Sequence, residues 1–278
     1  MTKTRVITAL VMAPIAIAAI WFLPTEWMMV VAAVLFLMGL WEWFDLAEIE
    51  DPVSRTVLLI AHMALMVAIV WGSRSSSGYT FALFELATVI GVVWWLLAGA
   101  WLTRHTFASN HESWARVFKL AAGALAVIPA WCALTWLHAT EPNGHRWLLA
   151  ALMVVWAADT GAYFAGRAFG RNKLAPTISP NKTVEGMFGG VASGVIVGCA
   201  LGVLAGATVD QLPLVAIASF AAAMFSVIGD LFESLLKRHV GVKDSGHLLP
   251  GHGGVLDRID GVLAALPVFA LSKALLGF

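Results

Sequence analysis

Four polar residues recur at helical spacing near the end of a long apolar segment: Asp230, Glu233, Ser234 and Lys237. Because residues three or four positions apart share a helix face, these side chains should form one polar stripe. Ionisable side chains at membrane depth cost roughly 2.5–3.5 kcal/mol each on insertion scales, and they usually mark a functional cavity. The alternative is a structural role, in which the stripe only joins helices or the side chains at the helix end snorkel to the surface. This alternative applies above all to Lys237 and Arg238.

The loop after this stripe combines bases, acids and glycines in a mixture that suits phosphate chemistry. Its bases and near-cations are Lys237, Arg238, Lys243, His252 and Arg258. Carboxylates such as Asp257 bind hard cations like Mg²⁺, which take phosphate oxygens as further ligands, while lysine and arginine hold the remaining phosphate charge. Gly253 and Gly254 let the backbone approach a ligand closely. Asp260, near a helix start, is as well placed to cap the helix as to act in catalysis.

A second loop, at about 167–184, supports the same site. Asp159, Tyr163 and Arg167 recur every four residues, so they share one helix face. Polar residues then gather before and at the start of the next apolar segment: Ser179, Asn181, Lys182, Thr183 and Glu185. Such residues before a helix N-terminus form a candidate anion cradle. Glu185 is equally well explained as a first-turn acid that the helix dipole favours.

The spacing of the histidines and cysteines predicts neither a zinc site nor a set of disulfide bonds. His239, His247 and His252 share one loop, but neither an HExxH pattern nor a Cys/His spacing is present, so zinc is not expected. Cys132 and Cys199 both lie inside apolar runs, where they are expected to be small buried hydrophobes.

The elements that must position these residues are membrane helices. Hydrophobic residues make up 60% of the 278 residues and charged residues only 12%, against about 25% charged in a typical soluble domain. The apolar runs of roughly 20 residues match a hydrocarbon core of about 30 Å, and their continuity favours helices over alternating barrel strands. We predict an all-α, polytopic integral membrane protein of about nine transmembrane helices, near residues 5–23, 27–46, 56–72, 81–103, 117–137, 146–166, 185–206, 212–236 and 258–276.

Charge distribution predicts an orientation with the N-terminus in the cytoplasm. Lysine and arginine gather in connections on the N-terminal side of the membrane, whereas the opposite connections hold only Arg74 and Arg146. Both long basic loops then face the cytoplasm, as expected for a bacterial-type inner membrane enzyme. We expect one membrane domain, 1–278, in which 1–145 supply scaffold helices and candidate dimer or lipid contacts, and 146–278 supply the catalytic helices and loops. The formal net charge of zero suggests no nucleic-acid partner.

The stretch from Ser234 to Asp260 resembles the long signature of phosphatidate cytidylyltransferases, also called CDP-diacylglycerol synthases. The fixed polar positions that carry the resemblance are Ser234, Lys237, Arg238, Lys243, Asp244, His252, Asp257, Arg258 and Asp260. Residues 159–170 and 179–186 also resemble the family, except that Asn181 stands where the family commonly has lysine. The specific resemblance covers roughly 156–262, whereas the first 150 residues match only in hydropathy.

The resemblance implies a reaction in which phosphatidic acid and CTP give CDP-diacylglycerol and pyrophosphate in phospholipid biosynthesis. It implies Mg²⁺ held by Asp230 and Asp257, with K⁺ as a candidate second cation, and a homodimer as a candidate assembly in the lipid membrane. The expected catalytic residues are Asp230, Asp257, Lys237, Arg238, Lys243, Asp244, Arg258 and Asp260. The expected substrate-binding residues are Asp159, Tyr163, Ser179, Lys182, Thr183, Glu185, Ser234, His252, Gly253 and Gly254.

Two other functions stay open on the sequence. An ion-coupled transporter would use Asp159, Asp230 and Asp257 along a pathway, but it does not explain glycine-rich basic loops on one face, and no inverted repeat is evident. Another lipid phosphotransferase, such as a polyprenol kinase, would also need a nucleotide and a metal. An assay for pyrophosphate release that requires both CTP and phosphatidic acid separates these alternatives.

Overall fold

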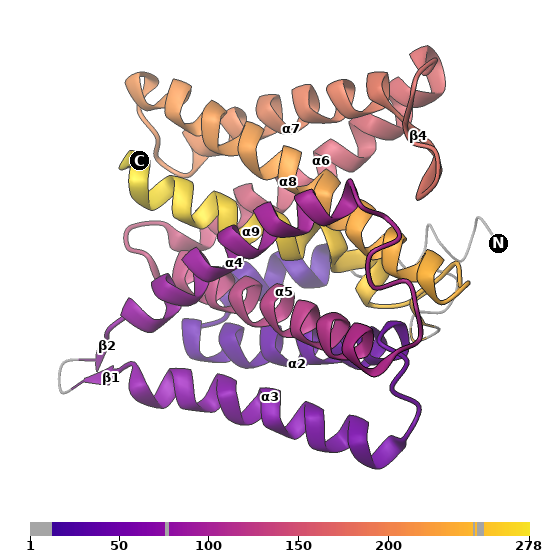
Figure 1. The fold of residues 1–278 in the computed structure, drawn as a ribbon. Helices are drawn as coiled ribbons and strands as arrows, with labels where there is room; N and C mark the ends of the chain where they lie inside the picture. The colour runs from indigo at the N-terminus through magenta and orange to yellow at the C-terminus, as the bar shows by residue number, and fades with distance from the viewer. Residues whose placement is uncertain (1–12, 76–77, 247, 249–252) are drawn as a thin grey trace.

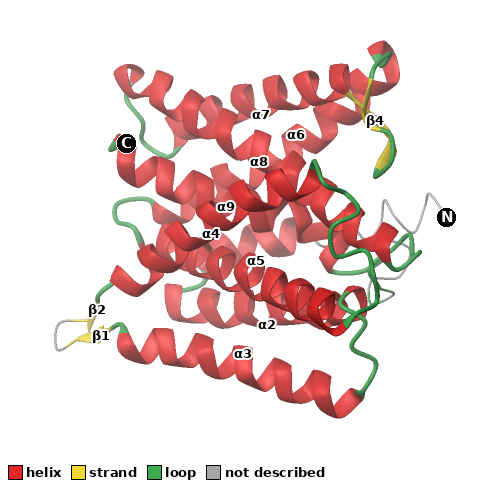
Figure 2. Cartoon of the chain, viewed as in Figure 1, coloured by secondary structure: helices red, strands yellow, loops and turns green. Residues whose placement is uncertain are grey.

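The structure is a computed structural model that describes residues 13–75, 78–246, 248 and 253–278. Its described part is almost entirely helical (Figure 2). The long helices are α2 (Thr25–Leu46), α3 (Pro52–Gly72), α4 (Ala82–Leu102), α5 (Ser113–Ala139), α6 (Gly144–Phe169), α7 (Val184–Leu204), α8 (Leu212–His239) and α9 (Leu256–Leu276). The short elements are two hairpins, β1 (Arg74–Ser75) with β2 (Gly78–Tyr79) and β3 (Lys173–Ala175) with β4 (Ser179–Thr183), and the 3₁₀ turn η1 (Val209–Gln211).

The prediction of a polytopic helical membrane protein is confirmed. Eight helices in the described ranges are long and apolar enough to cross a membrane, and each matches one predicted span. Of the remaining predicted span, 5–23, the structure describes the apolar helix Ala13–Phe22, and its earlier residues lie outside the described part. The two hairpins were not predicted, because a strand of two to five residues leaves no usable hydrophobic period.

The helices form a bundle whose connections gather at two ends (Figure 1). In this view α6 and α7 lie on one side, α2 and α3 lie on the opposite side, and α9 runs between them. The β3–β4 hairpin and the loop between α8 and α9 share one end, whereas β1, β2 and the C-terminus share the other. The two basic loops therefore lie at the same end of the bundle, as the sequence predicts.

An aromatic cluster fixes the rotation of α8. Phe232 is fully buried, and its ring centroid lies 5.2 to 6.2 Å from those of four tryptophans on α2 and α4: Trp43, Trp94, Trp95 and Trp101. The contacts to Trp94, Trp95 and Trp101 are edge-to-face and the contact to Trp43 is stacked, two arrangements that aromatic rings favour. Because Phe232 turns into this cluster, the acidic residues on either side of it in sequence point toward α6, α7 and α9.

Small residues bring α7 close to its neighbours. Glycines recur every fourth position along one face of the helix: Gly186, Gly190, Gly194, Gly198 and Gly202. A Cβ atom at Gly190 would collide with the backbone of Ala158 on α6, and one at Gly198 would collide with Ser219 on α8. Such close approach is the usual way in which membrane helices gain packing energy. The glycine stripe thus holds α6, α7 and α8 together around the site.

Candidate active site

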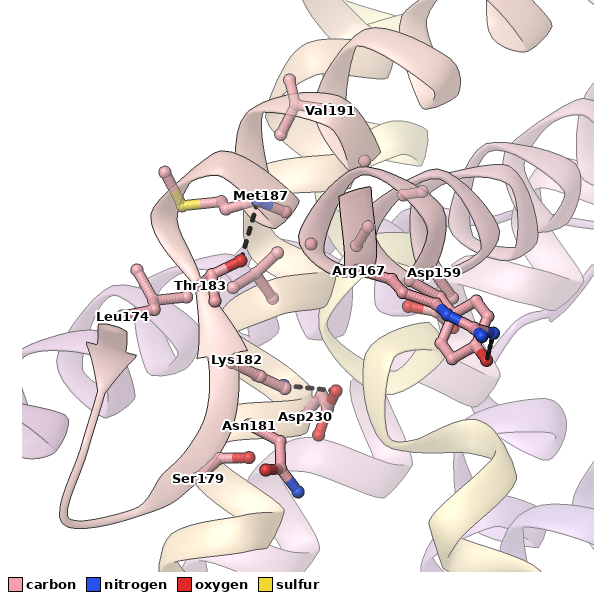
Figure 3. Close-up of a pocket in the computed structure, with 17 residues that line it drawn as sticks. Asp159, Arg167, Leu174, Ser179, Asn181, Lys182, Thr183, Met187, Val191 and Asp230 are labelled. Atoms are coloured by element: carbon pink, nitrogen blue, oxygen red, sulfur yellow. Dashed lines mark hydrogen bonds and ion pairs between the residues drawn. The ribbon is translucent and has the colours of Figure 1, made fainter. Parts of the chain in front are cut away.

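A cavity of about 620 Å³ opens between α6, the β3–β4 hairpin, α7 and α8 (Figure 3). The sequence-predicted residues that line it are Asp159, Tyr163, Arg167, Ser179, Lys182, Thr183 and Asp230. Asp159, Tyr163 and Arg167 all face the cavity, so the predicted shared helix face is confirmed. Asn181 also lines it, on the exposed side of β4. One cavity therefore collects residues from three separate stretches of the sequence.

The hairpin brings a base to an acid across this cavity. Lys182 on β4 forms an ion pair with Asp230 on α8 (Figure 3). Ser234, one helical turn after Asp230, lies with its hydroxyl 3.4 Å from the Asp230 carboxylate. On α6, the guanidinium group of Arg167 donates a hydrogen bond of 3.3 Å to the Tyr163 hydroxyl. The cavity thus offers cationic and hydroxyl groups beside two carboxylates, Asp159 and Asp230.

Three carboxylates form the candidate metal site. Oxygen atoms of Asp230, Glu233 and Asp260 lie within 4.8 Å of one another. They meet because Gly229 lets α8 approach the backbone of α9 at Asp260. Glu233 is buried, and its Oε1 atom has no hydrogen-bond partner among the described residues. A hard divalent cation prefers such oxygen ligands, and a cation would satisfy an oxygen that is otherwise costly to bury.

Asp257, the second expected metal ligand, is held by other partners in the structure. Its carboxylate accepts hydrogen bonds from Lys237 at 2.7 Å, from the Gly254 amide at 2.8 Å and from the Ser245 amide at 3.1 Å. Lys237 also donates to Glu233 at 2.6 Å. Lys237 is therefore a buried bridge that connects Asp257 to the acidic cluster, and it is not among the residues that line the cavity. A direct role for Asp257 in metal binding stays a prediction.

Thr183 and Glu185 have structural partners. The Thr183 hydroxyl accepts a hydrogen bond of 3.1 Å from the Gly186 amide and so caps α7. The Glu185 carboxylate accepts bonds from the amides of Arg171 and Asn172 and, at 2.7 Å, from the Asn172 side chain. Both residues therefore hold the hairpin against the start of α7.

The remaining expected residues lie at the end of α8, in the turn that follows it and at the start of α9. Four of them are exposed: Arg238, Lys243, Asp244 and Arg258. Gly253 adopts a positive φ of 82°, which favours glycine, and the buried Gly254 donates its amide to Asp257. Asp260 lies inside α9, which begins at Leu256, so it does not cap the helix. Among the histidines, His239 contacts the carbonyl of His105, whereas His247 and His252 lie outside the described residues.

Sequence reasoning missed two acids. Glu233 was placed on the polar stripe but not among the expected metal ligands, although its position three residues after Asp230 was a usable signal. Glu42, on α2, accepts hydrogen bonds from Ser245 and from the amide of Leu256. The only sequence signal for Glu42 was that it is an acid close to a predicted helix end. No local pattern reveals that its hydrogen-bond partners lie some 200 residues away.

Comparisons with known proteins identify the family to which the chain belongs. Residues 3–276 match the model of the cytidylyltransferase family. A phosphatidate cytidylyltransferase of Pseudomonas aeruginosa is 38% identical over 274 residues, which cover 97% of this chain and 96% of that protein. One of Haemophilus influenzae is 33% identical over 283 residues, covering 97% and 98%, and one of Bacillus subtilis is 43% identical over 135 residues, covering 49% and 50%. A membrane bundle with acids and bases around one cavity, matched by relatives over almost its whole length, places this chain in the cytidylyltransferase family.

Proposed function

We propose that this protein is a phosphatidate cytidylyltransferase, which forms CDP-diacylglycerol and pyrophosphate from CTP and phosphatidic acid. The Pseudomonas aeruginosa and Haemophilus influenzae relatives carry that name, and the alignment to each spans nearly the full chain. The observation that carries the proposal is the meeting of Asp230, Glu233, Asp260 and Lys182 beside one cavity at the end of the bundle. This end is where a soluble nucleotide can reach a lipid head group.

The chemistry needs positioning and charge neutralisation more than it needs a base. A phosphate oxygen of phosphatidic acid attacks the α-phosphorus of CTP, and the bond from that phosphorus to the bridging oxygen breaks to release pyrophosphate. The attacking oxygen is already ionised, so no proton has to be removed. Lys182 in the cavity supplies positive charge for the phosphates, and so do three exposed bases: Arg238 at the end of α8, Lys243 in the following turn and Arg258 at the start of α9. Ser179 lines the same cavity and offers a hydroxyl donor.

Mg²⁺ is the cofactor that these residues fit. Asp230, Glu233 and Asp260 would hold it, with Asp257 as the further ligand that the family resemblance implies. When bound, the ion would neutralise charge that develops on the reacting phosphates. Lys237 connects Asp257 and Glu233 by contacts to both carboxylates. The exposed carboxylate of Asp159 at the cavity is a candidate ligand for the second cation, K⁺.

The cavity end is proposed to face the cytoplasm. Lysine and arginine are concentrated in the connections at that end, as the positive-inside rule requires of cytoplasmic loops. CTP is a cytoplasmic nucleotide, and phosphatidic acid would enter from the adjacent leaflet. Residues 146–278 then form the catalytic part of one membrane domain, and the helices of residues 1–145 are the scaffold and the candidate surface for a homodimer.

The test is turnover by the purified protein in detergent or liposomes, with CTP, phosphatidic acid and Mg²⁺. Pyrophosphate release should require both substrates, stop on chelation and return when Mg²⁺ is added back. Release of CDP without pyrophosphate, on addition of a lipid alcohol, would instead identify a kinase. Ion or solute flux into liposomes without turnover would identify a transporter.

A further inference from the structure

Glu42 is a buried acid from the first half of the chain that contacts the loop before α9. It lies near the C-terminal end of α2 and is only 2% exposed. Its Oε2 atom accepts hydrogen bonds from the Ser245 hydroxyl at 3.1 Å and from the Leu256 amide at 2.8 Å. The backbone at Gly246 and Gly254 comes so close that a Cβ atom at either position would collide with the Glu42 carboxylate. The described residues at both ends of the loop thus pack closely against this side chain.

Ser245 carries the contact from Glu42 to the active-site acids. The Asp257 amide donates to the Ser245 hydroxyl oxygen at 3.3 Å, and the Ser245 amide donates to the Asp257 carboxylate at 3.1 Å. The Ser245 hydroxyl proton is directed at Glu42. Asp257 accepts from Lys237, and Lys237 donates to Glu233 of the acidic cluster. A continuous set of hydrogen bonds therefore runs from α2 to the candidate metal site.

A purely stabilising role explains Glu42 poorly. Its Oε1 atom is buried and has no hydrogen-bond partner among the described residues. Leaving a buried acceptor unsatisfied costs about 1–3 kcal/mol, more for a charged group. The Oε2 atom of Glu42 instead accepts from a side chain of the loop and from a backbone amide at the start of α9. Such a shared acceptor suits a residue that fixes a loop in position.

We propose that Glu42 is a positioning residue of the active site. It holds Ser245 and the first turn of α9 so that Asp257 and Lys237 keep Glu233 in the cation-binding arrangement. The inference rests on the proposed function where turnover is concerned. The effect of Glu42 on cation binding can be measured without turnover. It also gives the N-terminal helices a defined part in the site, beyond that of a scaffold.

The experiment compares Glu42→Gln with Ser245→Ala, their combination, and Asp45→Asn as the matched control. Asp45 lies one turn after Glu42 on α2, is half exposed and pairs with Arg55, away from the loop. Three quantities are measured for each protein in detergent: Mn²⁺ binding by electron paramagnetic resonance, turnover against Mg²⁺ concentration, and the thermal unfolding midpoint. Mn²⁺ replaces Mg²⁺ as the spectroscopic probe.

Glu42→Gln should weaken Mn²⁺ binding and raise the half-saturating Mg²⁺ concentration by about 10-fold, the usual scale for residues that orient metal ligands. Ser245→Ala should do the same, and the double variant should lose little more, because both changes break one set of contacts. Asp45→Asn should match the wild type. Three results would overturn the inference. The first is unchanged Mn²⁺ binding in Glu42→Gln, and the second is weaker Mn²⁺ binding that is fully explained by a lower unfolding midpoint. The third is that the effects of Glu42→Gln and Ser245→Ala on Mn²⁺ binding add fully in the double variant. A wild-type protein without turnover would refute the proposed function, and Mn²⁺ binding would still decide the role of Glu42.

Discussion

Lys182, on the hairpin between α6 and α7, forms an ion pair with Asp230 on α8 across the cavity. Both side chains are partly exposed, with 25% and 34% of their surfaces open to the surroundings, so the pair adds little to stability. Its position matters more. The ammonium group that now neutralises Asp230 is the one that can hold a phosphate once a cation takes the carboxylate.

Asp230→Asn should abolish turnover while the protein still inserts and folds. The amide keeps the size of the side chain but removes the charge that binds the cation, and losing a preorganised electrostatic contact costs roughly 10²–10³-fold in rate. Pyrophosphate release measures the effect, and size-exclusion chromatography measures folding. Asp210→Asn, an exposed acid at the opposite end of α8, is the matched control and should be fully active. Near-normal rates in Asp230→Asn would refute the metal assignment.

Asp257→Asn should lose turnover and should also unfold at a lower temperature than Asp230→Asn. The Asp257 carboxylate is almost buried and is bonded to Lys237, itself 9% exposed at the side chain. Removing one partner of a buried ion pair costs about 3–5 kcal/mol, because the other charge is left behind. Thermal unfolding followed by tryptophan fluorescence gives the comparison. Equal midpoints for the two variants would show that Asp257 is not part of the buried bridge.

Asn181→Lys should be tolerated. Asn181 is exposed on β4, so a longer side chain has room to extend, and the family resemblance described above implies lysine at this position. Substitutions at exposed positions usually change free energies by less than about 0.5 kcal/mol, roughly twofold in rate. Steady-state kcat and KM for CTP provide the measurement. A large fall in kcat would mean that the hairpin approaches the substrates differently.

Phe232→Ala should destabilise the bundle by about 3–5 kcal/mol, the usual cost of emptying a buried aromatic site. The cavity would lie among Trp94, Trp95 and Trp101, which pack around the ring. Phe220→Ala on the same helix, where the ring is half exposed, serves as the control and should cost much less. Similar unfolding midpoints for the two variants would contradict the role of the cluster in orienting α8.

The helices were predictable from the sequence because each depends on a local property. A run of apolar residues long enough for the bilayer defines a span wherever its partners lie, and Asp159, Tyr163 and Arg167 share a face by spacing alone. The two basic loops were expected on the same side of the membrane because two predicted spans separate them along the chain. Each of these inferences needs only the helical repeat and the thickness of the membrane.

The arrangement of the acids was not predictable, because it depends on how helices pack. The family resemblance pairs Asp230 with Asp257 as metal ligands, and this pairing stays a prediction. In the structure Gly229 lets α8 meet α9 at Asp260, which joins the acidic cluster, and Asp257 contacts Lys237. Capping was one of two alternatives for Asp260, and the start of α9 at Leu256 excludes it. Contacts between distant segments carry no local signature.

The glycine stripe of α7 ties the shape of the site to the surrounding lipid. Each glycine lowers helix stability in water by about 1 kcal/mol relative to alanine, yet within the hydrocarbon a broken backbone hydrogen bond has no water to replace it. α7 therefore depends on an apolar solvent to stay regular. Extraction into a harsh detergent should loosen α7 and the hairpin before the aromatic core around Phe232 gives way, so inactivation would precede any large loss of helix.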